Sequence, residues 1–341
     1  MNLFIHSIPN WLELTFLAFS IGILISLLWV LPPRESSVLS GHEHLRSRMW
    51  LFLTISIFAM LICSVFDLMI RSAEMSGKPV TEVFPDIPTV ISRTHYGSIW
   101  LIRTAVLVLT FIVLIAGRRR RESRAFLLFL FALASVVALT ESASGHAADK
   151  GDFSVVELAD LLHLLAASVW GGGLFTLSLT ILPHLRNDKD KEALAGSASR
   201  FSRIAGIAVG VIVPTALYNA WIYAGSIDAL VKSSYGWTII AKIILLSFLL
   251  YLGAFNHYIT VPLMRKAAGL PADRPGIIAP VLASRIKTRK ERTAQGFSRS
   301  VRAEAFLMVG MMLCAALLRH EVPAKHYLHQ HEKGVLHPHM H

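Results

Sequence analysis

Eight long apolar runs constrain what this 341-residue chain can fold into. Each is close to the about 20 residues that an α-helix needs to cross a bilayer. Charged residues make up only 16% of the sequence, whereas a soluble domain carries about 25%. We therefore predict an all-α polytopic membrane helix bundle with about eight transmembrane helices. The predicted spans are Trp11–Leu31, Met49–Ile70, Ser98–Ala116, Arg124–Ala143, Phe153–Leu182, Phe201–Ala224, Trp237–Thr260 and Val301–Leu318.

Lysine and arginine alternate between rich and poor loops. Rich loops are Pro32–Arg48 with three, Arg118–Arg124 with five, His184–Arg203 with five and Arg265–Ser300 with nine. The poorer loops are Arg71–Gly97 with three, and Ser144–Gly151 and Gly225–Gly236 with one each. Basic loops stay in the cytoplasm, so both termini are expected on the periplasmic side of a bacterial inner membrane.

The net charge of +11 is therefore not read as a nucleic-acid signal, because the basic residues serve to orient the spans. The longest basic loop is expected to lie against anionic lipid. An orientation signal alone explains it equally well.

A weak internal repeat divides the chain. Tyr96-Gly97 with Arg103 and Tyr235-Gly236 with Lys242 share one spacing. Gly22 before Leu31-Pro32 likewise parallels Gly173 before Leu182-Pro183. These matches favour two four-helix pseudo-repeats in the same orientation. The predicted units are an N-terminal half over residues 1–144, a second half over 145–319 and a His-rich tail over 320–341.

The fifth span carries Asp160, His163 and Trp170 at helical spacing, so the three side chains share one face. A charge within a bilayer costs roughly 2.5–3.5 kcal/mol on insertion scales, and such groups commonly face a cavity. Asp160 and His163 are therefore candidate metal ligands.

Other ionisable residues are predicted at a similar depth, in the outer halves of their spans. They are Glu13, Asp67, Arg103, Glu141 and Lys242. A water-filled pocket open to the periplasm explains this, with Glu141, Arg103 and Lys242 setting its charge. The alternative is a set of buried ion pairs, such as Arg103 or Lys242 with Asp160 or Glu141, which only fix helix packing.

Histidines gather at the chain end and around the outer rim. The tail has His320, His326, His329, His331, His337, His339 and His341, and the rim has His6, His95 and His146. Neutral imidazole is the commonest metal ligand, and such a strand suits copper, nickel or zinc, with copper favoured by the Irving–Williams order. A solvated tail and incidental rim histidines are the alternative.

Sulfur ligands give a weaker signal. Cys63 and Cys314 fall within predicted spans and form no CxxC motif, so a structural disulfide is not expected. Met308, Met311, Met312 and Cys314 lie together on the last span. Such residues could hold Cu(I), but ordinary core packing is the favoured interpretation.

Several motifs together resemble the CopD (PcoD) family of copper resistance membrane proteins. They are Gly145-His146-Ala147, the His163 to Trp170-Gly171-Gly172 helix, Arg200-Phe201-Ser202, Tyr235-Gly236 with Lys242, Asn256, and Arg302-Ala303-Glu304. The resemblance covers residues 145–318. It implies copper transport or copper resistance at the inner membrane, beside a periplasmic copper-binding partner of the CopC type.

Two other functions remain open. The same helix resembles the HemJ-type haem proteins, which would make this a b-type haem redox protein with His163 as an axial ligand. A factor that delivers copper to a cuproenzyme is a third reading. No catalytic residue is predicted, because hydrolase, zinc-protease and phosphate-loop motifs are missing from the sequence, and we expect a non-enzyme whose cargo is Cu(I) or Cu(II).

Overall fold

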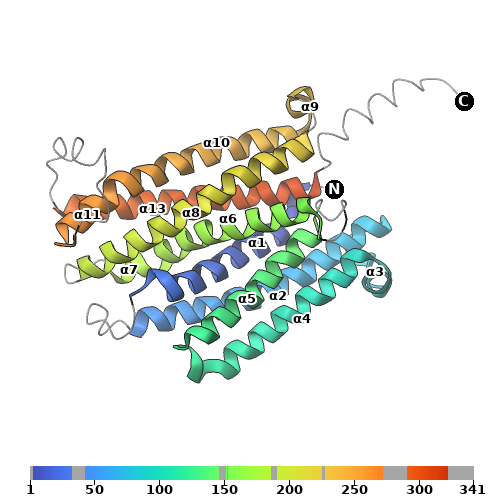
Figure 1. Cartoon of the computed structure of the whole chain (residues 1–341). Helices are drawn as coiled ribbons and strands as arrows, with labels where there is room; N and C mark the ends of the chain where they lie inside the picture. The colour runs from blue at the N-terminus through green and yellow to red at the C-terminus, as the bar shows by residue number, and fades with distance from the viewer. Residues whose placement is uncertain are drawn as a thin grey trace, which may run out of the picture.

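In the part of the polypeptide that the structure describes, eight long helices form a bundle (Figure 1). The computed structural model describes residues 3–32, 43–145, 151, 153–185, 190–224, 227–271 and 290–321. Across these ranges no residue is in a strand. All eight predicted spans are helices long and apolar enough to cross a membrane. The predicted all-α polytopic fold is thus confirmed.

The eight long helices differ in how they end. They are α1 (Leu3–Ile25), α2 (Glu43–Ser76), α4 (His95–Ala116), α5 (Arg124–Ala143), α6 (Val155–Thr176), α8 (Lys191–Ala224), α10 (Ser234–Phe255) and α13 (Lys290–His320). Short helices are α3 (Ile87–Arg93), α7 (Leu182–His184), α9 (Ile227–Lys232) and α11 (Val261–Ala267). The described residues also include two 3₁₀ turns, η3 (Val80–Glu82) and η4 (Gly117–Arg120), and three π-helical segments, η1 (Ser26–Val30), η6 (Leu177–Ile181) and η8 (Asn256–Thr260).

The helices extend beyond the predicted spans. The last span was predicted to begin at Val301, whereas α13 begins at Lys290. Similarly, α2 begins at Glu43, six residues before the predicted Met49. Hydropathy marks only the apolar segment, while a helix continues through polar residues for as long as its backbone hydrogen bonds continue. The predicted boundaries were therefore too short at these ends.

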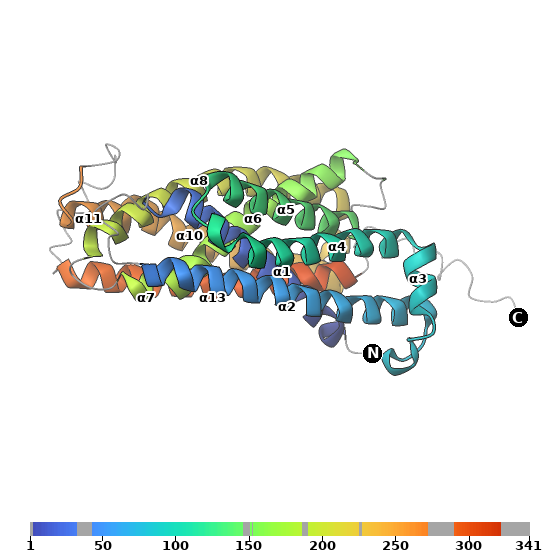
Figure 2. The same ribbon diagram turned by 90° about the horizontal axis from the view of Figure 1, so that it is seen from below.

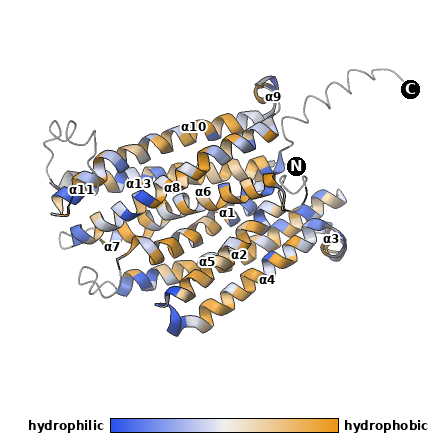
Figure 3. Cartoon of the chain, in the orientation of Figure 1, coloured by the Kyte–Doolittle hydropathy of each residue, from blue (hydrophilic) through white to orange (hydrophobic). Residues whose placement is uncertain are grey.

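One end of the bundle, which we call the basic end, carries strongly hydrophilic helix ends near α7 and α11 (Figure 3). There η4 follows α4 with Arg118, Arg119 and Arg120, and α11 ends in Arg265 and Lys266. At the opposite end α1 begins, α13 ends, and α3 packs beside α2 and α4 (Figure 2). The described helix ends that flank the loops predicted to be cytoplasmic are thus on one side.

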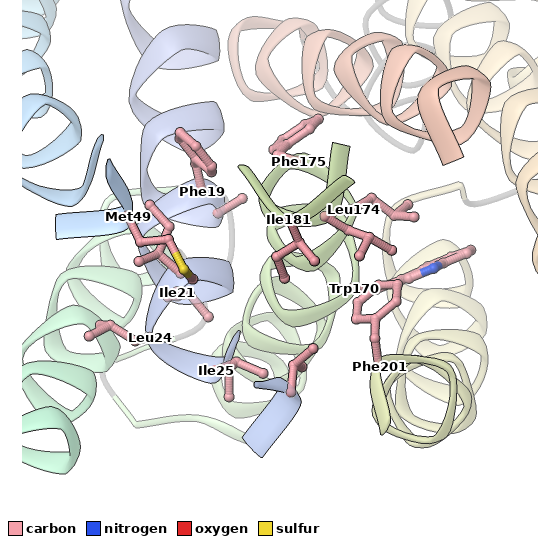
Figure 4. Close-up of a cluster of buried hydrophobic side chains, with 14 of the residues drawn as sticks. Phe19, Ile21, Leu24, Ile25, Met49, Trp170, Leu174, Phe175, Ile181 and Phe201 are labelled. Carbon is pink, nitrogen blue, oxygen red and sulfur yellow. The ribbon is translucent and has the colours of Figure 1, made fainter. Parts of the chain in front are cut away.

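Helices α1 and α6 cross at the centre of the bundle through glycines. A Cβ added to Gly22 would lie 1.9 Å from the carbonyl carbon of Gly172, and one added to Gly172 would lie 1.6 Å from the oxygen of Ala18. The two backbones therefore touch, as small residues allow in membrane helices. Around the crossing, Phe19 and Phe175 belong to one apolar core (Figure 4).

The two halves repeat several local features. A short helix precedes both α4 and α10, and the hydroxyl of Thr94 or Ser233 caps the following helix at the nitrogen of Gly97 or Gly236. Both glycines leave no room for a Cβ against the preceding short helix. These features support the predicted pseudo-repeat, whereas the exact domain limits remain a prediction.

The three π-helical segments share a cause. A proline follows each within two residues, at Pro32, Pro183 and Pro262. Proline lacks an N–H, and its ring collides with the carbonyl four residues earlier, which here lies inside each π segment. Widening the turn moves that carbonyl away.

Candidate functional site

Four charged residues form a buried cluster that we call the charged network, comprising Glu13, Arg103, Glu141 and Arg319. Nη1 of Arg103 donates to Oε1 of Glu13 over 3.2 Å and to Oε1 of Glu141 over 2.5 Å. Arg319 donates to the other oxygen of Glu141. Two guanidinium groups thus offset two carboxylates, as burial of charge in a membrane requires.

Polar neighbours extend this network. Oγ of Ser144 lies 2.9 Å from Nη2 of Arg103 and 2.5 Å from Nη2 of Arg319. Nearby, the hydroxyl of Tyr96 donates to Asp67 over 2.7 Å. Arg103 and Glu141, predicted to set the charge of a pocket, are therefore bound to each other. For these two residues the structure agrees with the alternative of a buried ion pair that ties helices together.

Two predicted ligands from opposite ends of the chain meet beside α2. Nδ1 of His6 lies 3.4 Å from Oε1 of Glu74, and Nδ1 of His320 lies 3.3 Å from the same oxygen. Arg71 holds the other oxygen of Glu74 over 3.1 Å. We call His6, Glu74 and His320 the rim cluster. Glu74 was not predicted from the sequence, although an acidic residue close to the end of a predicted span is a signal that could have identified it.

Asp160 and His163 both turn toward α8. Asp160 accepts from Ser142 over 2.8 Å and from Asn219 over 3.4 Å. Nδ1 of His163 lies 3.0 Å from Oγ1 of Thr215. Because Thr215 and Asn219 are one turn apart on α8, the two contacts form a continuous polar strip between the helices, which we call the α6–α8 strip.

The hydroxyl of Thr215 holds one ring nitrogen of His163. Its Oγ1 lies 3.0 Å from Nδ1 of His163, 2.7 Å from the carbonyl oxygen of Val211 and 3.1 Å from that of Ile212. In the tautomer whose Nδ1 donates to Thr215, Nε2 carries the lone pair. Neutral imidazole with one nitrogen held by a hydrogen bond is the form in which histidine binds metals.

A cavity of about 280 Å³ continues the same helix face toward the basic end. Trp170 on α6 and Phe201 on α8 line it (Figure 4). Its polar lining includes Ser202, Asn256, His257, Tyr258 and Glu304. This cavity was not predicted from the sequence, although the family-like motifs include Trp170, Phe201, Ser202, Asn256 and Glu304.

The remaining predicted site residues are not brought together. His95 sits at the start of α4, where Nε2 lies 3.3 Å from the carbonyl of Ala143. Lys242, like Asp160 a described residue, forms no ion pair with it, although it lies near enough to act on it electrostatically. His146, His326, His329, His331, His337 and His339 lie outside the described residues.

Metal ligation is not preformed in the described part of the chain. There, no three His, Cys, Asp or Glu side chains are arranged to hold an ion together. In the rim cluster both imidazoles approach one oxygen of Glu74 and surround that carboxylate. Cys63 and Cys314 are free thiols, and Met308 and Met312 pack in the apolar core, as predicted.

Two family models match the chain. The N-terminal domain model of copper resistance protein D-like proteins matches residues 4–155, and the copper resistance protein D model matches residues 195–318. The chain belongs to the CopD family of copper resistance proteins. The suspected resemblance is therefore confirmed.

Curated relatives agree with this family. Copper transport protein CutJ of Bacillus subtilis (strain 168) is 30% identical over 283 residues, covering 81% of this chain. Copper resistance protein D of Pseudomonas syringae pv. tomato is 27% identical over 212 residues, covering 61% of this chain and 68% of that protein. The inner membrane protein YebZ of Escherichia coli (strain K12) is 27% identical over 195 residues, covering 56% of this chain and 64% of that protein.

The chain spans 46% of the length of the Bacillus subtilis relative. No solved structure matches this CopD family member significantly.

Proposed function

We propose that this CopD family member moves copper across the bacterial inner membrane. The family and the names of its relatives support a copper-related function in that membrane. The basic loops on one side support an orientation with both termini in the periplasm. In this orientation the charged network and the rim cluster face the periplasmic half of the bilayer, and the cavity faces the cytoplasmic half.

The observation that carries this proposal is the rim cluster. His6 and His320 lie 314 positions apart in sequence, yet both contact Oε1 of Glu74. Imidazole nitrogens and carboxylate oxygens bind divalent first-row metals. Among these metals, Cu(II) binds such ligands with the highest affinity. His320 also begins the His-rich tail, so His326 and His329 could complete a ligand set with the rim histidines.

The α6–α8 strip supplies the next step. Asp160 and His163 offer a carboxylate and an imidazole beyond the rim, and His163 presents a nitrogen lone pair. From there Trp170 leads along the same helix face to the cavity. A cation can thus exchange between polar groups on one helix interface, which lowers the cost of leaving water. No catalytic residue is involved.

Copper uptake by proteoliposomes tests this proposal. The full-length protein is expected to accumulate copper and to show greatly reduced accumulation of zinc. A double variant, His6→Ala with His320→Ala, should slow uptake at limiting copper by tenfold or more, while excess copper restores it. The matched control is His44→Ala, an exposed histidine at the basic end, which should behave as wild type. Equal uptake by the double variant at limiting copper would remove the rim cluster from the route.

Spectroscopy separates this function from the haem alternative. The purified protein should contain copper after exposure to it and should show no Soret band. A strong Soret band that disappears in His163→Ala would instead establish a haem protein.

A further inference from the structure

Glu304 is a buried carboxylate that contacts no positively charged side chain among the described residues. It lies on α13, is 3% exposed and lines the cavity. Its Oε1 accepts from the amide nitrogen of Asn256 and, over 3.4 Å, from the hydroxyl of Ser300. Both donors are neutral. Among the described residues no lysine or arginine forms an ion pair with it or lines the cavity.

The charged network makes the contrast clear. Glu13 and Glu141 are equally buried, but each contacts Arg103 directly. A carboxylate at membrane depth that lacks such a partner is costly as an anion, and it ordinarily takes up a proton instead. Glu13 and Glu141 are thus neutralised by Arg103, whereas the charge of Glu304 must be neutralised by a proton or by another cation.

The cavity gives Glu304 access to an incoming cation. Its Oε2 lies near Gly253, where an added Cβ would be 3.8 Å from Oε2 and 3.7 Å from the ring of Trp170. An added Cβ at Gly253 would therefore be in van der Waals contact with both side chains. Trp170 is the residue at which the α6–α8 strip reaches the cavity, so Glu304 stands where the proposed route enters the half of the bilayer nearer the basic end.

Asn256 can serve either protonation state of Glu304. Its Nδ2 donates to Ser300 over 2.9 Å and to Glu304, while its buried Oδ1 accepts no hydrogen bond from the part of the chain that the structure describes. In this orientation the amide stabilises a carboxylate. An amide also offers an acceptor, so a rotated Asn256 would accept the proton of a neutral Glu304. The other titratable side chains lining the cavity are His257, whose Nδ1 lies 2.6 Å from Oγ of Ser202, and Tyr258.

We propose that Glu304 is the proton-exchange group of copper transport. The resting protein holds a neutral carboxylic acid there. When a copper ion enters the cavity, the O–H bond of Glu304 breaks, the proton leaves to water at the basic end, and the metal's positive charge neutralises the carboxylate. A returning proton displaces the copper ion. This inference rests on the proposed function, because it names the proton as the ion that is exchanged for copper at Glu304 during that transport.

Infrared difference spectroscopy on the full-length protein tests the exchange without any transport. At neutral pH the wild type should show the carbonyl stretch of a protonated carboxylic acid. Glu304→Gln should lack that band, and Glu304→Asp should shift it, which covers the case in which the glutamine variant folds poorly. The control is Glu192→Gln, an exposed acid in the first turn of α8, which should keep the band.

Copper addition then decides the coupling. Supplied as Cu(II), or as Cu(I) under anaerobic conditions, copper should remove the band and release about one more proton per ion from wild type than from Glu304→Gln. The inference would be overturned if the wild type lacked the band or if Glu304→Gln kept it. It would also be overturned if neither copper ion changed the band. Uptake measured in parallel reports separately on the proposed function, since wild type that takes up no copper would refute that function whatever the infrared band shows.

Discussion

Arg103 donates to Glu141 over 2.5 Å in a part of the bundle where both side chains are buried. The same guanidinium also holds Glu13. One cation therefore ties α1, α4 and α5 together, and Arg319 adds α13. Breaking such a cluster leaves charge buried without compensation, which ordinarily costs about 3–5 kcal/mol.

Arg103→Met should consequently be among the most destabilising single changes in the chain. It removes the ion pair of Glu13 with Arg103 and, among the described residues, leaves Glu141 paired with Arg319. A triple variant that also carries Glu13→Leu and Glu141→Leu should recover part of the loss, because fewer buried charges remain unpaired. Thermal unfolding in lipid–detergent micelles measures both. If the triple variant lost as much stability as the sum of the losses of the three single variants, the three side chains would not be energetically coupled.

The crossing of α1 and α6 predicts a second sensitive position. Gly22→Ala places a methyl group inside the backbone of Gly172, so the helices must separate and core packing is lost. Overpacking commonly costs about 1–3 kcal/mol, and more where backbone must move. Gly206→Ala, where an added Cβ meets nothing within 4 Å, is the matched control. The yield of folded protein and its melting temperature should fall only for Gly22→Ala, and equal behaviour would place the helix contact elsewhere.

Topology can be read from thiol labelling. With Cys63 and Cys314 replaced by alanine, Ser92→Cys in α3 should react with an impermeant reagent added to cells with a permeabilised outer membrane. Arg119→Cys in η4 should react only after the inner membrane is opened. Both parent side chains are exposed. The reverse pattern would invert the proposed orientation and put the rim cluster in the cytoplasm.

Much of the fold follows from hydropathy. A bilayer-length apolar run can satisfy its backbone only as a helix, which is why all eight spans were predictable. Their ends were less predictable, because α13 begins in a polar stretch at Lys290. Which helices pack against each other could not be predicted, since nothing in the sequence shows that α1 packs against α6 through Gly22 and Gly172.

The candidate site was predictable only in part. Asp160 and His163 share a face because helical spacing dictates it, and both contact α8. The ion pair between Arg103 and Glu141 was one of the alternatives, but residue spacing within each helix does not determine which residues on different helices form a pair. Glu74 and the cavity around Glu304 required the tertiary fold, because their partners are 68 and 48 positions away in the chain.

The His-rich tail should matter only when copper is scarce. Deleting residues 322–341 removes six of the seven tail histidines but leaves His6, His320 and the α6–α8 strip. Uptake should therefore slow several-fold at limiting copper and be normal at excess, as expected for a collector that raises local concentration. Uptake assays over a range of copper concentrations check this. A loss that persists at saturating copper would mean that the tail belongs to the transport route itself.

The most direct test is copper accumulation by proteoliposomes that contain His163→Ala. Its Nε2 is the one imidazole lone pair that the α6–α8 strip presents between the rim and the cavity. With folding verified by the melting temperature, accumulation is expected to disappear at every copper concentration, while His184→Ala at the basic end retains it. Accumulation by His163→Ala at the wild-type rate would contradict the proposed route through the membrane.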